Sequence, residues 1–162
     1  MGEIIKVGMA DLKTCTEPDS LTTLGLGSCV GVALYDPVTK VSGLLHLMLP
    51  DSTQIKNNQN TAKFADTGIA ELCAQMNKKG AVQSRLVAKI AGGAQMFSFG
   101  SSSNDIMSVG QKNVEATKKI LAKMGIRIIA EDTGLNYGRT IIFDSVTGKL
   151  RIRAVGKSDT EI

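Results

Sequence analysis

The sequence predicts a single α/β domain over residues 1–162, and three observations support this fold class. Segments 30–35 and 41–49 have the period-two pattern of strands and flank a turn, which is typical of a β-hairpin. Segments 61–79 and 110–124 repeat apolar residues at helical spacing. A chain of 162 residues is long enough to bury one hydrophobic core without a disulfide or a metal.

Turn and capping residues separate the predicted elements. Residues 36–39 (DPVT) form the hairpin turn, and Gly80 and Gly125 end the two helices. The segment after residue 10 is polar, carries Cys15 and is predicted as a loop, and the charged tail at residues 156–162 is predicted to be flexible. Strands are predicted over residues 3–10, 21–26, 30–35, 41–49, 82–91, 126–130, 140–143 and 150–155.

Composition excludes several classes of protein. Aromatic residues make up 4% of the chain and Trp is absent, which argues against base stacking and a nucleic-acid partner. The longest apolar stretch, residues 44–49, is too short for membrane insertion. Three Cys without a CxxC pair indicate neither a disulfide framework nor a structural zinc site. We therefore expect a cytoplasmic protein that uses no metal and no cofactor.

The hairpin register predicts a thiol beside an imidazole. If residues 36–39 form a four-residue loop, Tyr35 pairs with Lys40 and Cys29 lies directly opposite His46. Directly opposed residues have Cβ atoms about 4.5–5.5 Å apart, so the two side chains are predicted to meet. A slip of one residue would place them on opposite faces of the sheet.

A thiol beside an imidazole is a candidate nucleophile, because the imidazole accepts its proton and an ion pair would lower the pKa of Cys29. Backbone N–H groups at Gly27 and Ser28 are candidate oxyanion donors, and a hydroxyl at Thr22 or Thr23 is the nearest group that could orient His46. The alternative is that both side chains are ordinary core residues, since free Cys is often a small buried hydrophobe.

Two Phe residues in a Ser-rich loop allow two interpretations. Phe97 and Phe99 either cover the core or form an exposed anchor for another protein.

Several motifs together resemble the CheD family of bacterial chemoreceptor glutamine deamidases. Residues 25–37 read GLGSCVGVALYDP, and a His follows the Cys seventeen residues later within HLMLP. Further segments that carry the resemblance are KFADTGIAEL, KIAGGAQMF, GQKNVEATKKIL and EDTGLNYGRTIIF. The chain departs from the family pattern at Leu135, where a second glycine is common after EDTG.

The resemblance implies a sandwich of β-sheet with flanking helices and mostly antiparallel strands. It also implies that Cys29 is the nucleophile, His46 the base and Thr23 the assisting residue. The expected substrates are glutamines of methyl-accepting chemoreceptors, which are converted to glutamates with release of ammonia. The expected regulatory partner is a CheC-type phosphatase. A binding module for that phosphatase and the receptors, with catalysis secondary, is the alternative function.

Overall fold

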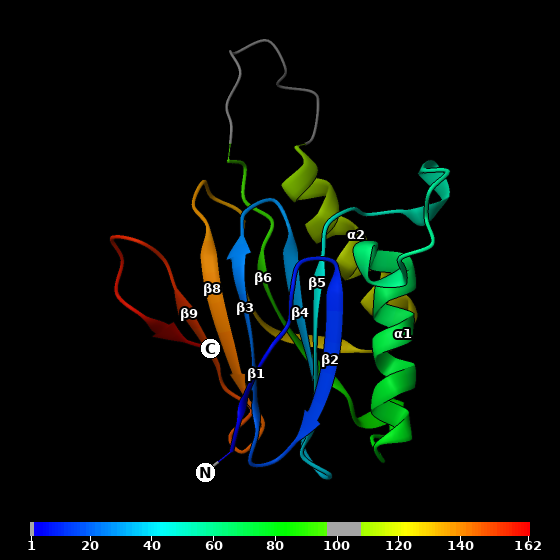
Figure 1. Ribbon diagram of the computed structural model, residues 1–162, viewed down its shortest axis with the longest axis vertical. Coiled ribbons are helices and arrows are strands. Elements are labelled where there is room, and N and C mark those ends of the chain that lie inside the picture. The colour runs from blue at the N-terminus through cyan, green and yellow to red at the C-terminus, as the bar shows by residue number, and fades with distance from the viewer. Residues whose placement is uncertain (1, 97–107) are drawn as a thin grey trace.

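The computed structural model describes residues 2–96 and 108–162 (Figure 1). Within these ranges the strands form two five-stranded sheets. The first sheet has the order β1 (Ile4–Lys6), β3 (Ser20–Leu26), β8 (Arg139–Asp144), β9 (Leu150–Arg153) and β10 (Thr160–Glu161). The second has the order β2 (Asp11–Thr16), β5 (Val41–Leu47), β4 (Val30–Asp36), β6 (Val87–Gly92) and β7 (Arg127–Thr133). The helices are α1 (Ala65–Lys78), α2 (Val109–Lys123) and the short 3-10 helices η1 (Ser52–Gln54), η2 (Thr61–Lys63) and η3 (Gln83–Arg85).

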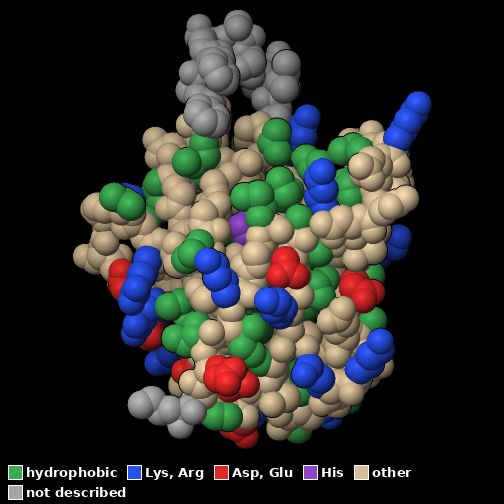
Figure 2. All heavy atoms as spheres, in the orientation of Figure 1, with side chains coloured by type: hydrophobic (Ala, Val, Ile, Leu, Met, Phe, Trp, Pro, Cys, Tyr) green, Lys and Arg blue, Asp and Glu red, His purple; other side chains and the backbone are tan. Residues whose placement is uncertain are grey.

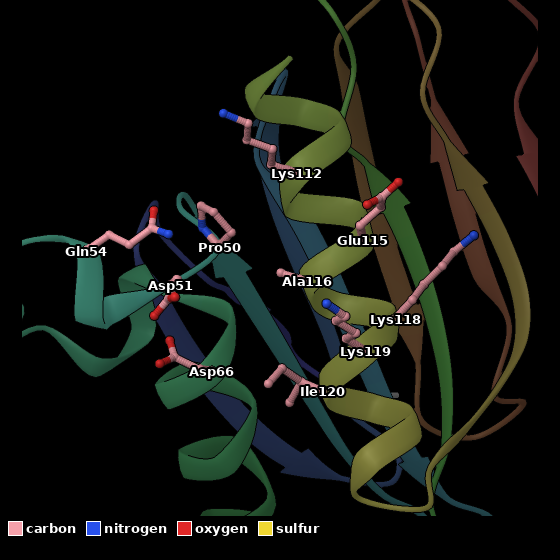
Figure 3. Close-up of a pocket in the computed structure, with 10 residues that line it drawn as sticks. All are labelled: Pro50, Asp51, Gln54, Asp66, Lys112, Glu115, Ala116, Lys118, Lys119 and Ile120. Atoms are coloured by element: carbon pink, nitrogen blue, oxygen red, sulfur yellow. The ribbon is translucent and has the colours of Figure 1, made fainter. Parts of the chain in front are cut away.

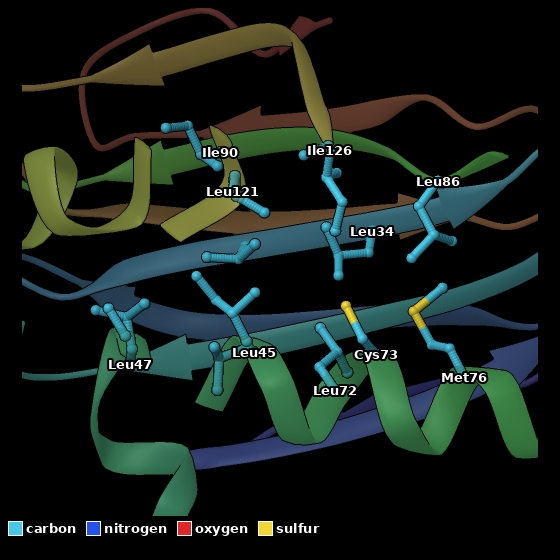
Figure 4. Close-up of a cluster of buried hydrophobic side chains, with 14 of the residues drawn as sticks. Leu34, Leu45, Leu47, Leu72, Cys73, Met76, Leu86, Ile90, Leu121 and Ile126 are labelled. Carbon is cyan, nitrogen blue, oxygen red and sulfur yellow. The ribbon is translucent and has the colours of Figure 1, made fainter. Parts of the chain in front are cut away.

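The two sheets pack against each other, and α1 and α2 cover the other face of the second sheet (Figure 1). One core fills the space between the sheets and includes Leu21, Ala33, Leu44 and Phe143. The other lies between the second sheet and the helices and includes Leu45, Ile69, Leu72 and Leu121 (Figure 4). Among the described strands only the β1–β3 and β6–β7 pairs are parallel, so the predicted α/β sandwich with mostly antiparallel strands is confirmed.

Both predicted helices form, with shifted starts. The segment from residue 61 begins with η2, and α1 starts only at Ala65 because Phe64 is extended. Ser108 caps α2: its hydroxyl accepts the backbone N–H of Gln111 at 3.2 Å, and the Gln111 side chain accepts the N–H of Ser108. No helix in the described ranges is long and apolar enough to cross a membrane.

The structure differs from the predicted elements at both ends of the chain. The segment predicted as a loop after residue 10 is β2, which pairs antiparallel with β5. The left-handed backbone of Ala10 (φ 53°) makes the turn into it, a conformation that the sequence does not signal at an alanine. The tail predicted to be flexible contains β10, which pairs with β9, and the backbone of Ile162 bonds to Leu150 in both directions at 2.9 and 3.0 Å.

The β4–β5 hairpin has a different register from the predicted one. Asp36 pairs with Val41, so the loop consists of residues 37–40 rather than 36–39. Asp36 stays in the strand because its carboxylate accepts the N–H of Val38 from inside the turn (2.9 Å), and Lys40 takes a left-handed backbone (φ 60°). The shift moves each strand by one residue, so Gly31 and not Cys29 lies opposite His46.

Asp36 is fully buried and joins the hairpin to the segment that follows α1. Its Oδ2 accepts the backbone N–H of Val82 at 2.9 Å and an Nη2 proton of Arg85 at 2.9 Å. Burial alone would raise the pKa of this carboxyl, but Arg85 and the surrounding N–H groups outweigh it. They hold the pKa of Asp36 well below its usual range.

We expect Asp36→Asn to lower the free energy of unfolding at pH 7 by about 1.5–3 kcal/mol, the range for a hydrogen bond to a charged group. Because the folded state holds this pKa below its unfolded value of about 3.9, the contribution is present above that pH and is lost as the pH falls below it. Urea titrations between pH 7 and pH 2 measure both effects. Asp144→Asn is the control: Asp144 accepts the N–H of Val146 in the next hairpin, and no ion pair reaches it within the described residues. An equal loss in both variants would show that the Arg85 pair contributes nothing.

Candidate active site

Thr23, Cys29 and His46 come from three segments and meet in the layer between the two sheets. Thr23 lies on β3 of the first sheet, His46 on β5 of the second, and Cys29 directly before β4. Thr23 and His46 are fully buried and Cys29 is 8% exposed. His46 shares its face of β5 with Leu44, as the alternation of residues 41–49 predicts.

A hydrogen bond between the sheets determines the tautomer of His46. Thr23 Oγ1 donates to the carbonyl of Val7 at 2.8 Å and lies 2.7 Å from His46 Nδ1. A hydroxyl has one proton, so the second contact requires a proton on Nδ1. Nε2 therefore carries the lone pair, and it is buried without a hydrogen-bond partner in the described part of the chain. Thr22 plays no part here, because its hydroxyl donates to the carbonyl of Ile141 at 2.8 Å.

Cys29 and His46 are diagonal neighbours rather than a directly opposed pair. The residue opposite His46 is Gly31, two residues after Cys29. Side chains two residues apart on a strand point to the same face, so the changed register keeps Cys29 on the face of His46. The core between the sheets accordingly includes Cys29.

The glycines at residues 92 and 93 hold the backbone around Cys29. The N–H of Gly93 donates to the carbonyl of Cys29 at 2.8 Å, and the N–H of Ala94 donates to the carbonyl of Gly27 at 2.9 Å. Gly92 has a φ of 105°, and a Cβ there would lie 2.3 Å from the Cys29 carbonyl oxygen. The two backbones can approach this closely only because residue 92 has no side chain.

Burial favours the neutral forms of the thiol and the imidazole. It raises the pKa of the Cys29 thiol, an effect that the backbone N–H of Cys29 only partly offsets. It also lowers the pKa of His46. Both directions disfavour the predicted ion pair with a lowered thiol pKa. A thiolate forms here only if its proton passes to His46 as the reaction proceeds.

The N–H group of Gly27, one of the two predicted oxyanion donors, has another role in the structure. The N–H of Gly27 donates to the carbonyl of Gly25 at 3.0 Å and so is already used inside the turn. Ser28 is half-buried, and its carbonyl accepts a hydrogen bond from Asn113. Phe97 and Phe99 lie outside the described residues.

Asn113 is a site residue that the sequence analysis missed. It is fully buried on α2, and its Nδ2 donates to the carbonyls of Ser28 and Met48, both at 2.9 Å. The sequence does carry a signal for its burial. Asn113, Thr117 and Leu121 are spaced four residues apart and therefore lie on one face of α2, the face that is buried. A buried amide on such a face needs partners, and here these are the segments that carry Cys29 and His46.

Arg139 holds the loop beside Gly92. Its side chain is buried, donates to the carbonyl of Gly134 at 3.1 Å and pairs with Asp132 at 3.1 Å. The N–H of Gly134 donates in turn to the carbonyl of Gly92 at 2.9 Å. Leu135 has a left-handed backbone (φ 62°), which explains why a glycine suits this position.

A groove of about 790 Å³ separates η1 and the start of α1 from the outer face of α2 (Figure 3). Its lining includes Asp51, Asp66, Lys112 and Glu115, and none of the three candidate catalytic residues. The carboxylate of Asp66 accepts the hydroxyl of Ser52 at 2.7 Å, so it is part of the local fold. Within the described residues no group of three or more His, Cys, Asp and Glu side chains is placed to hold a metal ion.

The fold and the site define the class of protein. A buried thiol, an imidazole with a free Nε2 on the same face of the sheet and a hydroxyl that orients Nδ1 are the groups found in enzymes that use covalent thiol chemistry. Residues 48–154 match the family model described as CheD chemotactic sensory transduction. The chain belongs to the CheD family, as its motifs predict.

Named relatives match over the length of the chain. A probable chemoreceptor glutamine deamidase CheD of Lachnoclostridium phytofermentans is 64% identical over 162 residues, covering 100% of both chains. Its counterpart from Caldanaerobacter subterraneus is 57% identical and covers 95% of this chain and 94% of its own. The chemoreceptor glutamine deamidase CheD of Halalkalibacterium halodurans is 52% identical and covers 100% of both chains. Among solved structures, a hypothetical protein YfiH of Bacillus licheniformis matches with a TM-score of 0.46 and 19% identity, over 78% of this chain and 51% of its own.

The chain has a single His, so the tautomer of His46 can be measured directly. We expect ¹⁵N NMR of histidine-labelled protein at pH 7 to show a protonated Nδ1 and an unprotonated Nε2. Because burial lowers the pKa of His46, the imidazole should stay neutral until the pH falls below its ordinary value of 6.5. Thr23→Val removes the acceptor and should yield a mixture of tautomers, while Thr22→Val should not. A proton on Nε2 of the wild-type protein would contradict the assignment.

Proposed function

We propose that this chain hydrolyses the side-chain amide of glutamines in chemoreceptors, with Cys29 as nucleophile, His46 as base and acid, and Thr23 as the residue that orients His46. The family and the names of relatives that match the chain end to end support the reaction and the substrate. One observation carries the residue assignment: the hydrogen bond that His46 Nδ1 donates to Thr23 Oγ1 leaves Nε2 as a free base on the face that carries Cys29.

The reaction begins when Cys29 Sγ attacks the side-chain carbonyl carbon of glutamine while its proton moves to His46 Nε2. The resulting tetrahedral intermediate collapses as His46 returns this proton to the leaving nitrogen, which departs as ammonia and leaves a thioester. Water then attacks the thioester and gives its proton to Nε2. The C–S bond breaks, Cys29 recovers a proton from His46, and glutamate is released.

The lowered pKa of His46 suits the acid step. An imidazolium that is unfavourable in its buried surroundings gives up its proton readily, so it protonates the leaving nitrogen efficiently. Thr23 Oγ1 accepts from Nδ1 in both protonation states and keeps the ring in one orientation throughout.

The depth of the thiol supports a side-chain substrate. Cys29 is 8% exposed, so a main-chain amide of a folded partner is too bulky to reach it. The carboxamide of glutamine stands at the end of two methylene groups and extends beyond the surface of a helix. Such a slender group needs the least room to reach the small exposed part of Cys29.

Deamidation assays should show that the three residues act together. We expect Cys29→Ser to abolish ammonia release from a purified receptor cytoplasmic domain, and His46→Gln to slow it about 10²–10⁴-fold. Thr23→Val removes one hydrogen bond to a charged group, worth about 1.5–3 kcal/mol, and should slow release about 10- to 100-fold. The one-dalton mass gain at each modified glutamine provides an independent readout.

Cys15→Ser is the matched control for the thiol. Cys15 is also buried in the core between the sheets, but on β2, where its Sγ lies 4.0 Å from Ser145 Oγ. This variant should keep the wild-type rate. If Cys29→Ser retained a substantial fraction of the ammonia release, the nucleophile would have to be a different group.

We further propose that receptor helices and a CheC-type phosphatase bind at the opening of this site, in the cytoplasm. Leu24, Met96 and Leu135 are 48%, 43% and 65% exposed. The Met96 side chain lies against Gly27, and the N–H of Gln95 donates to the carbonyl of Leu135 at 2.8 Å. Figure 2 shows the face of the molecule that is turned toward the viewer in Figure 1. Hydrophobic side chains gather in the upper part of this face, at the end of the molecule where β3 leads into β4. An apolar surface around the opening suits an amphipathic helix.

Binding assays in the Cys29→Ala background separate docking from turnover. We expect Met96→Asp and Leu135→Asp each to weaken binding of a receptor fragment about 10- to 100-fold, the effect of losing one buried apolar side chain. Val38→Asp is the control, because Val38 is exposed in the hairpin turn at the other end of β4. Isothermal titration with the receptor fragment, and separately with a CheC-type phosphatase, measures both affinities. Equal losses in all three variants would contradict a docking surface at the opening.

A further inference from the structure

The loop that carries Cys29 and the end of β5 lie at the edge of the second sheet, where the hydrogen bonds between β4 and β5 stop. The last β4–β5 pair at this end is Val30 with Leu47. Cys29 comes just before this pair and Met48 just after it, so the strand ladder does not fix their separation. The hydrogen bonds from Gly93 and Ala94 tie the loop of Cys29 to the end of β6, and a separate interaction ties it to the end of β5.

Asn113 supplies that interaction from α2. Its Nδ2 donates one hydrogen bond to the carbonyl of Ser28 and one to the carbonyl of Met48, both at 2.9 Å. Ser28 is the residue before Cys29, and Met48 is two residues after His46. The amide thus bridges the ends of the two strands directly beyond their last pair.

The orientation of this amide follows from its partners. Two carbonyl oxygens can only accept, so they require the NH₂ group of Asn113 on their side, and both of its protons are used. This orientation leaves Oδ1 buried without a hydrogen-bond partner among the described residues. An unpaired buried acceptor costs about 1–3 kcal/mol, a cost that the two hydrogen bonds donated by Nδ2 have to offset.

We propose that Asn113 is a positioning residue for the thiol chemistry, which sets the distance between Cys29 Sγ and His46 Nε2. This inference rests on the proposed function of Cys29 and His46. Asn113 does not contact the reacting atoms and acts through Ser28 and Met48. Two carbonyls held on one NH₂ group cannot move apart without breaking a hydrogen bond. Gly93 and Ala94 already hold the carbonyls of Cys29 and Gly27, and the Asn113 bridge adds a direct link between the loop of Cys29 and the end of β5.

Kinetic comparison of two variants on the same helix tests the proposal. Asn113→Ala removes the bridge, whereas Thr117→Ala removes a buried side chain one turn later that donates only to the backbone carbonyl of Asn113 at 2.7 Å. We expect Asn113→Ala to lower kcat about 10²-fold, the scale of a misplacement near 1 Å, with a much smaller change in KM. Thr117→Ala should keep kcat within a few-fold of wild type. The rates are compared at temperatures where the two variants have equal stability.

A double-mutant cycle distinguishes positioning from general destabilisation. If Asn113 acts by positioning Cys29 relative to His46, Asn113→Ala should slow the His46→Gln protein very little, because that protein has no imidazole left to position. The same cycle is measured on the alkylation of Cys29 by iodoacetamide as a function of pH, with peptide mapping to separate Cys29 from Cys15 and Cys73. Burial raises the pKa of Cys73 to about 11, so this thiol should stay unreactive at neutral pH.

Each outcome decides the proposal. A loss of kcat no larger than that of Thr117→Ala, or losses that multiply in the double variant, would overturn it. Asn113→Asp keeps the shape and loses both donors, so it replaces Asn113→Ala if the latter does not fold. Failure of both Asn113 variants to fold, while Thr117→Ala folds, would make the role purely structural. If the wild-type protein did not deamidate receptors but the alkylation cycle was still coupled, the proposed function would fail and the positioning role would stand.

Discussion

The hydrogen bond between Thr23 Oγ1 and His46 Nδ1 joins the two sheets at the point where the candidate chemistry takes place. Thr23 is itself held by the carbonyl of Val7, which belongs to the segment after β1. The position of the imidazole therefore depends on the packing of one sheet against the other, and Leu21, Leu44 and Phe143 provide much of that packing. A local change in either sheet therefore changes the orientation of the imidazole ring through this hydrogen bond.

The same burial that fixes the ring also determines its electrostatics. Removing a thiol and an imidazole from water favours their neutral forms, and within the described residues no carboxylate hydrogen bonds to His46. The protein thus holds a weak nucleophile and a weak base until a substrate arrives. Burial favours the protonated thiol, which is a weaker nucleophile than a thiolate. Geometry, rather than a preformed thiolate, has to supply the reactivity of Cys29.

The sequence predicted the elements with strong local patterns and the face on which the site lies. The hairpin pattern placed Cys29 and His46 on one face, and an error that shifts both strands by one residue leaves faces unchanged. The short strand at Asp11–Thr16 was missed because its pattern is polar and its turn uses a left-handed alanine. Asn113 was missed for another reason: its partners lie 65 and 85 residues away, and no local pattern encodes such contacts. Reasoning from the residues alone left Thr22 and Thr23 open, and the alternation of side chains along β3 separates them, because Thr23 reaches His46 while the hydroxyl of Thr22 bonds to Ile141.

The two glycines beside Cys29 have a consequence for how relatives of this protein are interpreted. Gly92 is required because a methyl group there would overlap the Cys29 carbonyl, and Gly93 because a Cβ would lie 2.2 Å from Val114. Both requirements are steric and come from the fold, so they persist in a descendant that has lost its thiol and its activity. An inactive homologue would be expected to keep this glycine pair. Its presence in a distant sequence therefore indicates shared ancestry and backbone shape, whereas retained activity has to be judged from the proposed catalytic side chains at positions 23, 29 and 46.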